Sequence, residues 1–376
     1  MADEQGQIVI IGAGPAGLST ALHLLYWRPA FAPHITIFDK ATFPREKLCG
    51  GGLTEDAETI LHRLGLDIDE IPNKTVPELA FIVPGWHFRY KSKKNHTLRV
   101  ISRTAFDDWL RQKVANLGVR VTENCAVTAL RQENGVVVLE TESGLYNADL
   151  VVLAEGSNGS LSQQVFPSRI PNKARLVEAF VQFSDVPHAD VKTAVFDYTP
   201  ICGGISGYFW IFPTPGPESS IGYFDAHMGR TKNANLAQLL RSSLTTQGNA
   251  LIKGHPILQF TPRHNNQNGQ ILAVGDCAGA DPLLGEGIGF ALGSGYYAAK
   301  HILDSIDRRG GIAKDYQWEL VRSSMGRALY IRWCIAQILF NATDLFWQRM
   351  IWKTLNPIVV WIAQHWLLGW AEELKY

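Results

Sequence analysis

The sequence lacks an excess of charge of either sign, because Lys plus Arg and Asp plus Glu each number 35. A nucleic-acid-binding protein usually carries a basic excess, so this balance argues against nucleic acid as a partner. Charged residues are only 19% of the chain and hydrophobic residues are 46%, which excludes a disordered chain. The length of 376 residues predicts two or three domains.

Cysteine is scarce, and the five cysteines are widely spaced, without a C-x-x-C pair. This excludes a disulfide framework and a cysteine zinc site, and it favours a reducing compartment. The eleven histidines lack metal-ligand spacing and no G-x-S-x-G motif occurs, so we predict no metal and no hydrolase triad. The acidic first residues argue against a signal peptide, which favours a cytoplasmic location.

Glycine is concentrated in a few motifs, and the first of them is a dinucleotide fingerprint. A β-branched strand, a G-x-G-x-x-G turn and an apolar helix pattern follow one another from residue 7 to residue 25. The three glycines are Gly12, Gly14 and Gly17. Asp39 ends the next β-branched run, where its carboxylate can accept hydrogen bonds from ribose hydroxyl groups. The spacing predicts a βαβ unit that holds a pyrophosphate at the helix N-terminus.

Hydrophobic periodicity predicts further elements along the chain. Helices are expected from about residue 54, over 104–117, over about 286–305, and through most of the chain after 315. Strands are expected within 78–102 and 175–225, and over 119–121, 126–130, 136–140, 150–153 and 271–275.

A second Gly-rich turn, residues 275–288, favours FAD over NAD. It reads Gly-Asp-Cys-Ala-Gly, then Asp-Pro-Leu-Leu-Gly-Glu-Gly-Ile. Asp276 can bond a ribityl chain, and the backbone N–H groups near Gly287 and Ile288 can face the flavin pyrimidine edge, where the helix dipole favours negative charge. Glu286 is interpreted as a carboxylate in the first helical turn.

Together these segments resemble the geranylgeranyl reductase family of flavoproteins, within the group that has the p-hydroxybenzoate hydroxylase-type FAD fold. The matching motifs are the fingerprint at 12–17, Pro-Arg-x-Lys-x-Cys-Gly-Gly at 44–51, Tyr-x-Trp-x-Phe-Pro at 208–213 and the turn at 275–288. The residues at 103–110, Arg-x-x-Phe-Asp-x-x-Leu, also resemble a helix start that recurs in this group.

The resemblance implies an α/β fold with a discontinuous Rossmann-type FAD-binding domain, formed by residues 1–75, 100–165 and 265–310. An inserted β-sheet substrate-binding domain would comprise 76–99 and 166–264. A Trp-rich helical region, 311–376, would follow.

The resemblance also implies which residues contact FAD: Gly12, Gly14, Pro15, Ala16, Gly17, Asp39, Lys40, Arg45, Cys49, Gly50, Gly51, Arg103, Val127, Gly275, Asp276, Pro282, Gly285, Gly287 and Ile288. Tyr208, Trp210 and Phe212 would line an apolar tunnel, although simple core packing explains their alternation nearly as well. Two residues depart from the family pattern. Glu155 stands where Asp is usual, and Cys277 where alanine is common.

The implied reaction is the reduction of carbon–carbon double bonds in a hydrophobic isoprenoid. An isolated alkene needs a proton donor besides a hydride, and Cys49 or Tyr208 is the candidate catalytic residue. A water could serve instead, and Cys49 could be a structural thiol. Lys47 is either a neighbour of the flavin or a solvated charge. The electron donor is NADPH or ferredoxin. No second Rossmann motif occurs, but members of this group often lack one, so its absence does not decide between the two donors.

Two other functions stay open. The first is an FAD-dependent monooxygenase or halogenase of the same fold, although hydroxylases of the group often carry Gly-Asp-Ala-Ala-His at the second turn. Halogenases carry Trp-x-Trp-x-Ile-Pro, which residues 208–213 match only in part. The second is a catalytically silent flavoprotein that acts as a partner or assembly factor.

Tryptophan is concentrated near the C-terminus, where residues 333–376 hold six of the eleven. Basic residues are interspersed, and the most apolar stretch, 355–370, is too short and too polar for a membrane span. Such a segment suits a membrane surface, or it packs on the substrate-binding domain and buries its tryptophans. The sequence does not indicate the oligomeric state.

Overall fold

The computed structural model describes residues 6–92, 96–169, 172–187, 189–228, 234–245, 250–308 and 313–376. Its first layer is a six-stranded sheet in the order β18-β19-β12-β1-β2-β8. The strands are β18 (Gln267–Asn268), β19 (Ile271–Ala273), β12 (Leu150–Leu153), β1 (Ile8–Ile11), β2 (Ile35–Phe38) and β8 (Arg120–Thr122). All neighbours pair in parallel except β18 with β19. Every residue of β1 and β12 is buried, as both-sided packing requires.

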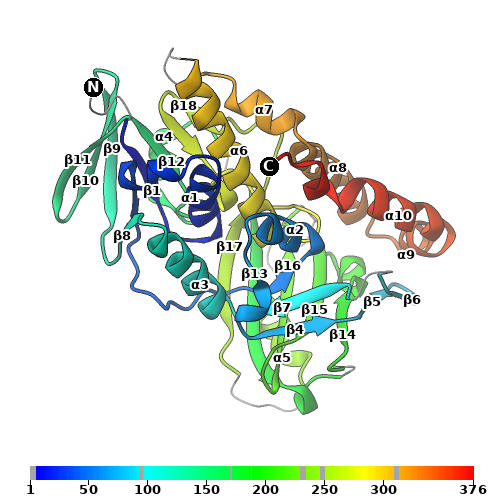
Figure 1. Cartoon of the computed structure of the whole chain (residues 1–376). Coiled ribbons are helices and arrows are strands. Elements are labelled where there is room, and N and C mark those ends of the chain that lie inside the picture. Colours follow the sequence, from blue (N-terminus) through cyan, green and yellow to red (C-terminus); the bar gives the residue numbers. More distant parts are fainter. Residues whose placement is uncertain are drawn as a thin grey trace.

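Helices cover one face of this sheet and a small antiparallel sheet covers the other. The main helices are α1 (Pro15–Trp27), α2 (Glu55–Arg63), α3 (Arg103–Asn116) and α6 (Ile288–Asp307), and α1 lies beside α6 (Figure 1). Their apolar side chains form one core with the even-numbered residues of β1. The opposite face packs on β9 (Val127–Glu133), β10 (Val136–Thr141) and β11 (Gly144–Ala148). The sequence patterns predicted β9 and β10 but not the largely exposed β11.

A seven-stranded sheet forms the second main layer, in the order β17-β13-β16-β15-β14-β5-β6. Its strands are β17 (Lys253–Leu258), β13 (Lys173–Gln182), β16 (Glu218–Asp225), β15 (Gly207–Pro213), β14 (Thr193–Asp197), β5 (Glu78–Val83) and β6 (Trp86–Tyr90). One face packs on α5 (Leu236–Ser242). The other face is aromatic and includes Tyr208, Trp210 and Phe212 from β15.

Smaller elements join the two main sheets. A three-stranded sheet is formed by β3 (Gly52–Leu53), β7 (Leu98–Ile101) and β4 (Asn73–Val76). The helix α4 (Ser160–Val165) follows β12 after a short loop. Short helical turns occur at η1 (Pro29–His34), η2 (Ile68–Glu70), η3 (Phe183–Asp185), η4 (Thr199–Gly203) and η5 (Gly275–Cys277).

The chain after residue 315 is helical, as predicted. The elements are α7 (Tyr316–Arg322), α8 (Ser324–Asn341), α9 (Leu345–Arg349), η6 (Met350–Thr354), α10 (Asn356–Ile362), η7 (Ala363–Leu367) and η8 (Trp370–Glu373). In Figure 1, α8, α9 and α10 extend along one side of the molecule as an orange-to-red arm. No helix among the described residues has the length and apolar character needed to cross a membrane.

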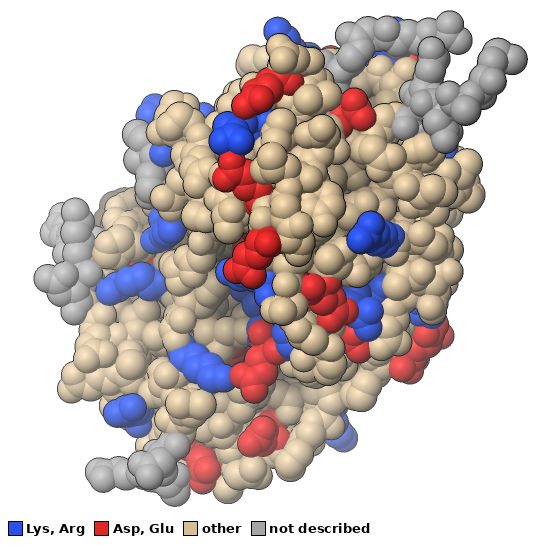
Figure 2. Space-filling model, turned by 90° about the vertical axis from the view of Figure 1, so that its left-hand side faces the viewer, with Lys and Arg blue, Asp and Glu red and all other residues tan. Residues whose placement is uncertain are grey.

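The structure confirms the predicted fold class, an α/β fold with a Rossmann-type domain, added β-sheet and a helical C-terminal region. Strands of the six-stranded sheet come from separated stretches of the chain, and the limits assigned to each domain stay a prediction. On the face drawn in Figure 2, basic and acidic side chains are interspersed within the described part of the chain. The prediction that nucleic acid is no partner also stays a prediction.

Candidate functional site

A cavity of about 800 Å³ lies between the six-stranded and seven-stranded sheets. This volume is toward the upper end for ligand-binding pockets. Sixteen of the nineteen predicted cofactor residues line it, and so do Tyr208, Trp210 and Phe212. Gly17, Gly275 and Pro282 are the three that do not line the cavity. That the nineteen residues contact FAD stays a prediction.

The fingerprint turn forms one end of the cavity. Gly12 has φ +109°, and a Cβ atom there would lie 2.3 Å from the carbonyl oxygen of Ala154, so only glycine fits. A Cβ atom on Gly17 would lie 2.1 Å from the carbonyl oxygen of Gly12, so Gly17 serves the packing of α1 on the turn. Gly14 is different, because it has room on its cavity side. Pro15 and Ala16 begin α1 and turn its N-terminus toward the cavity.

Asp39 is held rigidly at the end of β2. Its Oδ2 accepts the backbone N–H of Ala13 at 2.7 Å, and its Oδ1 accepts that of Ala41 at 2.8 Å. The carboxylate therefore fixes the fingerprint turn and also lines the cavity, beside the exposed Lys40 and the first residue of β9, Val127.

Two arginines meet at the fully buried carboxylate of Asp107. Arg103 Nε and Nη2 donate to its two oxygens at 2.8 and 2.9 Å, and Arg45 Nη2 lies 3.1 Å from Oδ2. Burial is the largest single influence on the Arg103 pKa and lowers it, but the Asp107 carboxylate and the Cys49 sulfur together outweigh burial and raise the pKa. Arg45 Nε is buried and has no hydrogen-bond partner among the described residues. The Arg45 guanidinium lies beside Gly14, so a partly unpaired cation adjoins the phosphate-binding turn.

The second Gly-rich turn closes the cavity from the side of α6. Gly275 has φ +61°, and a Cβ atom there would lie 2.6 Å from the Ala16 side chain, so this glycine allows two motifs to touch. Asp276 lines the cavity, and its Oδ2 accepts the hydroxyl of Ser157 at 3.1 Å. That leaves its Oδ1 facing Gly287 at the start of α6.

The interpretation of Glu286 as a group in the first helical turn is wrong, since α6 begins only at Ile288. Its Oε1 accepts the hydroxyl of Thr54 at 2.5 Å, and its Oε2 pairs with Arg332 Nη1 at 2.7 Å. Arg332 is fully buried in α8 and also binds Asp281 Oδ2 at 2.7 Å. The C-terminal region therefore holds both ends of the loop that carries Gly285 and Gly287.

Cys49 and the following glycines separate the polar end of the cavity from its aromatic end. The thiol is half-buried, and the backbone N–H of Gly51 points to Sγ at 3.5 Å. Arg103 lies close enough to interact with the same sulfur. A Cβ atom on Gly50 would lie 3.2 Å from Phe212 and from Trp210 Nε1, so this loop rests directly on the aromatic side chains.

The aromatic end of the cavity is formed by the seven-stranded sheet. Tyr208, Trp210 and Phe212 share one face of β15 and are joined there by Phe196 and Phe224. These residues both pack as a core and line the cavity. Core packing and a lining role, the two explanations offered for their alternation in the sequence, are therefore compatible. The Tyr208 hydroxyl donates to the carbonyl of Leu284, and burial raises its pKa well above the ordinary value.

Sequence patterns missed two polar groups near the aromatic end, His255 and Glu178, and left the role of Lys47 open. Lys47 Nζ lies 3.1 Å from His255 Nε2, and both line the cavity. Burial lowers the pKa of Lys47, and burial together with the Lys47 charge lowers that of His255 to about 4. Glu178 is fully buried on β13 and accepts the Ser220 hydroxyl at 2.6 Å. No motif marks His255 or Glu178, whose strands reach the site only through the fold.

Both departures from the family pattern have local explanations. Glu155 Oε1 accepts the backbone N–H of Ser162 at 2.6 Å, so its longer side chain satisfies the N-terminus of α4. The Cys277 thiol is fully buried and donates to the carbonyl of Gly156 at 3.2 Å. Burial raises its pKa, which suits a small structural side chain.

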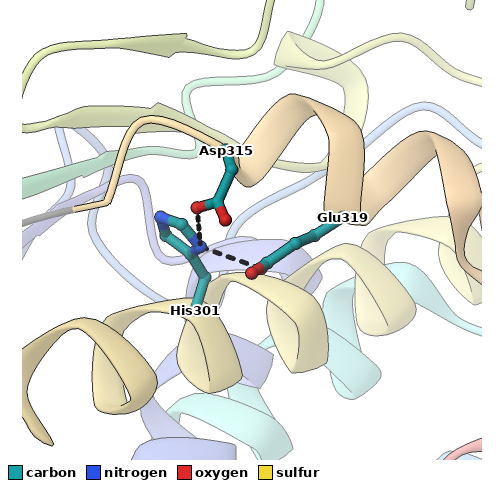
Figure 3. Close-up of side chains that lie close together, drawn as sticks. All are labelled: His301, Asp315 and Glu319. Carbon is teal, nitrogen blue, oxygen red and sulfur yellow. Dashed lines mark hydrogen bonds and ion pairs between the residues drawn. The ribbon is translucent and has the colours of Figure 1, made fainter. Parts of the chain in front are cut away.

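One group of side chains has the composition of a metal site among the described residues, but it lies outside the cavity. His301 on α6 faces Asp315 and Glu319 near the start of α7 (Figure 3). Its Nδ1 lies 2.8 Å from Glu319 Oε2 and 4.0 Å from Asp315 Oδ1, and its Nε2 lies 3.1 Å from the carbonyl of Ala313. These contacts join α6 to α7. The prediction of no metal stays a prediction.

The residues present fit an FAD cofactor. The cavity brings together a glycine turn with open space at Gly14, a partly unpaired arginine, and the carboxylates of Asp39 and Asp276. Arg45 and the N-terminus of α1 suit a pyrophosphate, whereas Asp39 and Asp276 suit the hydroxyl groups of a ribose and a ribityl chain.

Comparisons with known proteins agree with this assignment. A family model described as FAD-NAD(P)-binding matches residues 9–158. A menaquinone reductase of Mycobacterium tuberculosis is 27% identical, over 81% of this chain and 78% of the relative. A digeranylgeranylglycerophospholipid reductase of Methanococcus vannielii is 24% identical, over 68% of this chain and 65% of the relative.

Solved structures show the same fold. A geranylgeranyl bacteriochlorophyll reductase-like protein from Thermoplasma acidophilum aligns with a TM-score of 0.78 at 19% identity, covering 98% of each chain. A variant of the halogenase PltM in complex with FAD aligns with a TM-score of 0.68 at 16% identity, covering 96% of this chain and 82% of the other. The predicted resemblance is thus confirmed for the fold, and the chain has the fold of FAD-dependent oxidoreductases.

Proposed function

We propose that this FAD-dependent oxidoreductase reduces carbon–carbon double bonds in a hydrophobic isoprenoid of the geranylgeranyl type. The observation that carries the proposal is a cavity with two unlike ends. Its polar end fits FAD, and its aromatic end offers the side chains of Phe196, Tyr208, Trp210, Phe212 and Phe224. An isoprenoid chain has no polar groups to pair, so an aromatic surface suits it.

Cys49 is the best-supported proton donor. When bound and reduced, FAD supplies a hydride equivalent, and an isolated alkene also requires a proton. The Cys49 thiol lies where the two ends of the cavity meet. After the proton leaves Sγ, the Gly51 backbone N–H and the Arg103 guanidinium would stabilise the remaining thiolate. Tyr208 is less suited, because its hydroxyl proton is directed at Leu284 and its pKa is high.

The test is an anaerobic single turnover. The bound flavin is reduced, a prenyl-lipid mixture is added, and the flavin absorbance is followed while products are analysed by mass. Reoxidation without oxygen, with products heavier by two hydrogen atoms, is the expected result. Cys49→Ala should retain FAD and lose at least about a hundredfold in the rate of this step. Supplying NADPH or reduced ferredoxin in turn identifies the electron donor.

A monooxygenase or halogenase is the second candidate, and the halogenase fold match favours it. Flavin reoxidation only after oxygen is admitted, with an oxygenated or halogenated product, would support this candidate and contradict alkene reduction. Normal FAD binding without any product would favour a catalytically silent flavoprotein.

A further inference from the structure

The arm formed by α8, α9 and α10 carries an unusual amount of exposed apolar surface. Ten of the eighteen exposed large hydrophobic side chains found among the described residues fall between residues 330 and 368. They are Tyr330, Ile338, Leu345, Phe346, Trp347, Leu355, Ile358, Trp361, Trp366 and Leu368. We call this set the outer apolar surface. So dense a set of exposed apolar groups on a folded protein indicates an interaction site.

The inner face of the same arm is packed, so the outer exposure does not reflect a loose segment. Ala336, Leu339 and Phe340 of α8 belong to the aromatic core of the seven-stranded sheet. Trp352 packs on Tyr198 with ring centroids 5.0 Å apart, and its Nε1 donates to Gln348. The two sides of the arm therefore differ: one builds the core beside the cavity, and the other has no partner among the described residues.

Charge indicates what covers the outer apolar surface. Among residues 330–368, which span the outer apolar surface, the exposed charged side chains are the basic Arg349 and Lys353 and one carboxylate, Asp344. Tryptophan is abundant there, with Trp347, Trp361 and Trp366 exposed to about half their surface. Exposed tryptophan with nearby basic residues is typical of segments that lie in the headgroup layer of an anionic bilayer.

We propose that the outer apolar surface docks on an anionic lipid bilayer. The inference rests in part on the proposed function, since a lipid substrate has to be collected from a membrane. The arm is suitably placed, because its inner side chains belong to the same aromatic core as Tyr208, Trp210 and Phe212. Docking would bring the aromatic end of the cavity close to the source of its substrate.

The test uses the whole FAD-loaded protein and sedimentation with lipid vesicles. One set contains equal parts of phosphatidylcholine and phosphatidylglycerol, and the other contains phosphatidylcholine alone. We expect the protein to sediment with the mixed vesicles and much less with the neutral ones. Added salt should weaken binding to the mixed vesicles.

A paired set of variants tests the surface itself. The Trp361 ring contacts the rings of Trp366 and His365, so the double change Trp361→Ser with Trp366→Ser disturbs little else. It should lower the vesicle partition coefficient at least about tenfold. Trp318→Ser is the matched control, because Trp318 is 62% exposed but lies on α7, outside the surface. FAD content and melting temperature verify that each variant is folded.

Several outcomes would overturn the proposal. They are absence of binding to either vesicle, equal loss in the control, and unchanged binding in the double variant. A concentration-dependent dimer that the double variant abolishes would assign the surface to a second copy of the chain instead. Reduction of a short prenyl alcohol in solution separates the two proposals: reduction without vesicle binding contradicts docking alone, and vesicle binding without reduction contradicts the proposed function alone.

Discussion

Among single residues, Glu178 shows how burial near the site changes the pKa of a carboxyl group. Burial raises its pKa to about 7, while the Ser220 hydroxyl, the peptide of Cys49 and the Arg103 charge all oppose this rise. In the unfolded chain the same carboxyl titrates near its ordinary value of about 4.3. Between these two values the folded protein holds a proton that the unfolded chain has lost. The free energy of unfolding therefore falls as pH rises through this interval.

Glu178→Gln should remove that dependence. Glutamine keeps an acceptor for the Ser220 hydroxyl but cannot ionise. We expect the stability of the wild type relative to this variant to fall by about 2 to 3 kcal/mol between about pH 5 and pH 8. Urea unfolding at several pH values measures the difference, and groups such as Asp56 that titrate in both proteins cancel. Parallel stability curves would show that Glu178 does not titrate in this range.

Two glycines of one motif, Gly12 and Gly14, have separable roles. Gly12 needs its positive φ and has the Ala154 carbonyl 2.3 Å from where a Cβ atom would stand. Gly14 has extended backbone angles, and the nearest atom to its Cβ position is Arg45 Nη2 at 3.6 Å. The first glycine thus serves the fold, and the second leaves space for the ligand.

Gly12→Ala should therefore cost at least about 2 kcal/mol of unfolding free energy. Gly14→Ala should change stability by less than about 1 kcal/mol but weaken FAD binding at least about tenfold, since its methyl group enters the cavity. Urea unfolding of the FAD-free proteins and fluorescence titration with FAD give the two quantities. Equal FAD affinity in wild type and Gly14→Ala would contradict the assigned position of the phosphates.

The sequence was informative where the site requires a backbone conformation or a close approach that few residue types allow. Gly12, Gly14 and the turn at 275–288 could be predicted because close approach to a ligand or a helix permits few residues at fixed spacing. His255 and Glu178 could not, since each lies on a strand that reaches the site only through tertiary packing. The strand β11 was missed for a different reason. It is short and largely exposed, and its Leu145 is not part of an alternating apolar pattern that would indicate a strand.

Among structural elements, the loop from Asp281 to Gly287 depends on a helix about fifty residues later. Asp281 accepts the backbone N–H groups of Leu283 and Leu284 as well as Arg332 Nη1. Arg332 Nη2 donates in addition to the carbonyl of Leu367 at 2.7 Å. One buried guanidinium therefore links the C-terminal helices to the loop that lines the cavity.

Arg332→Met should destabilise the protein by about 3 to 5 kcal/mol, because Asp281 and Glu286 would remain buried as unpaired carboxylates. Adding Glu286→Gln should recover part of that loss, since one of the two charges disappears. Urea unfolding of the two single variants and the double variant completes the cycle. FAD affinity, measured in parallel, should fall in Arg332→Met before global unfolding. Simple additivity in this cycle would contradict the ion-pair role.

For the whole molecule, the essential feature is that two sheets of different chemistry enclose one cavity. The six-stranded sheet contributes the polar turns, and the seven-stranded sheet contributes the aromatic face. Neither part alone contains both ends of the site. A change confined to the aromatic end should therefore alter substrate use without altering FAD binding.

Leu176→Trp tests this division, because Leu176 lines the cavity from β13 on the same side as the aromatic residues. The larger ring would fill space meant for the substrate, so we expect prenyl reduction to fall at least about tenfold. FAD content and the rate of flavin reduction should stay near the wild-type values. Leu251→Trp is the control, since Leu251 is 71% exposed and lies away from the cavity lining. Equal loss of FAD and of prenyl reduction in Leu176→Trp would mean that the two ends do not act as separate binding regions.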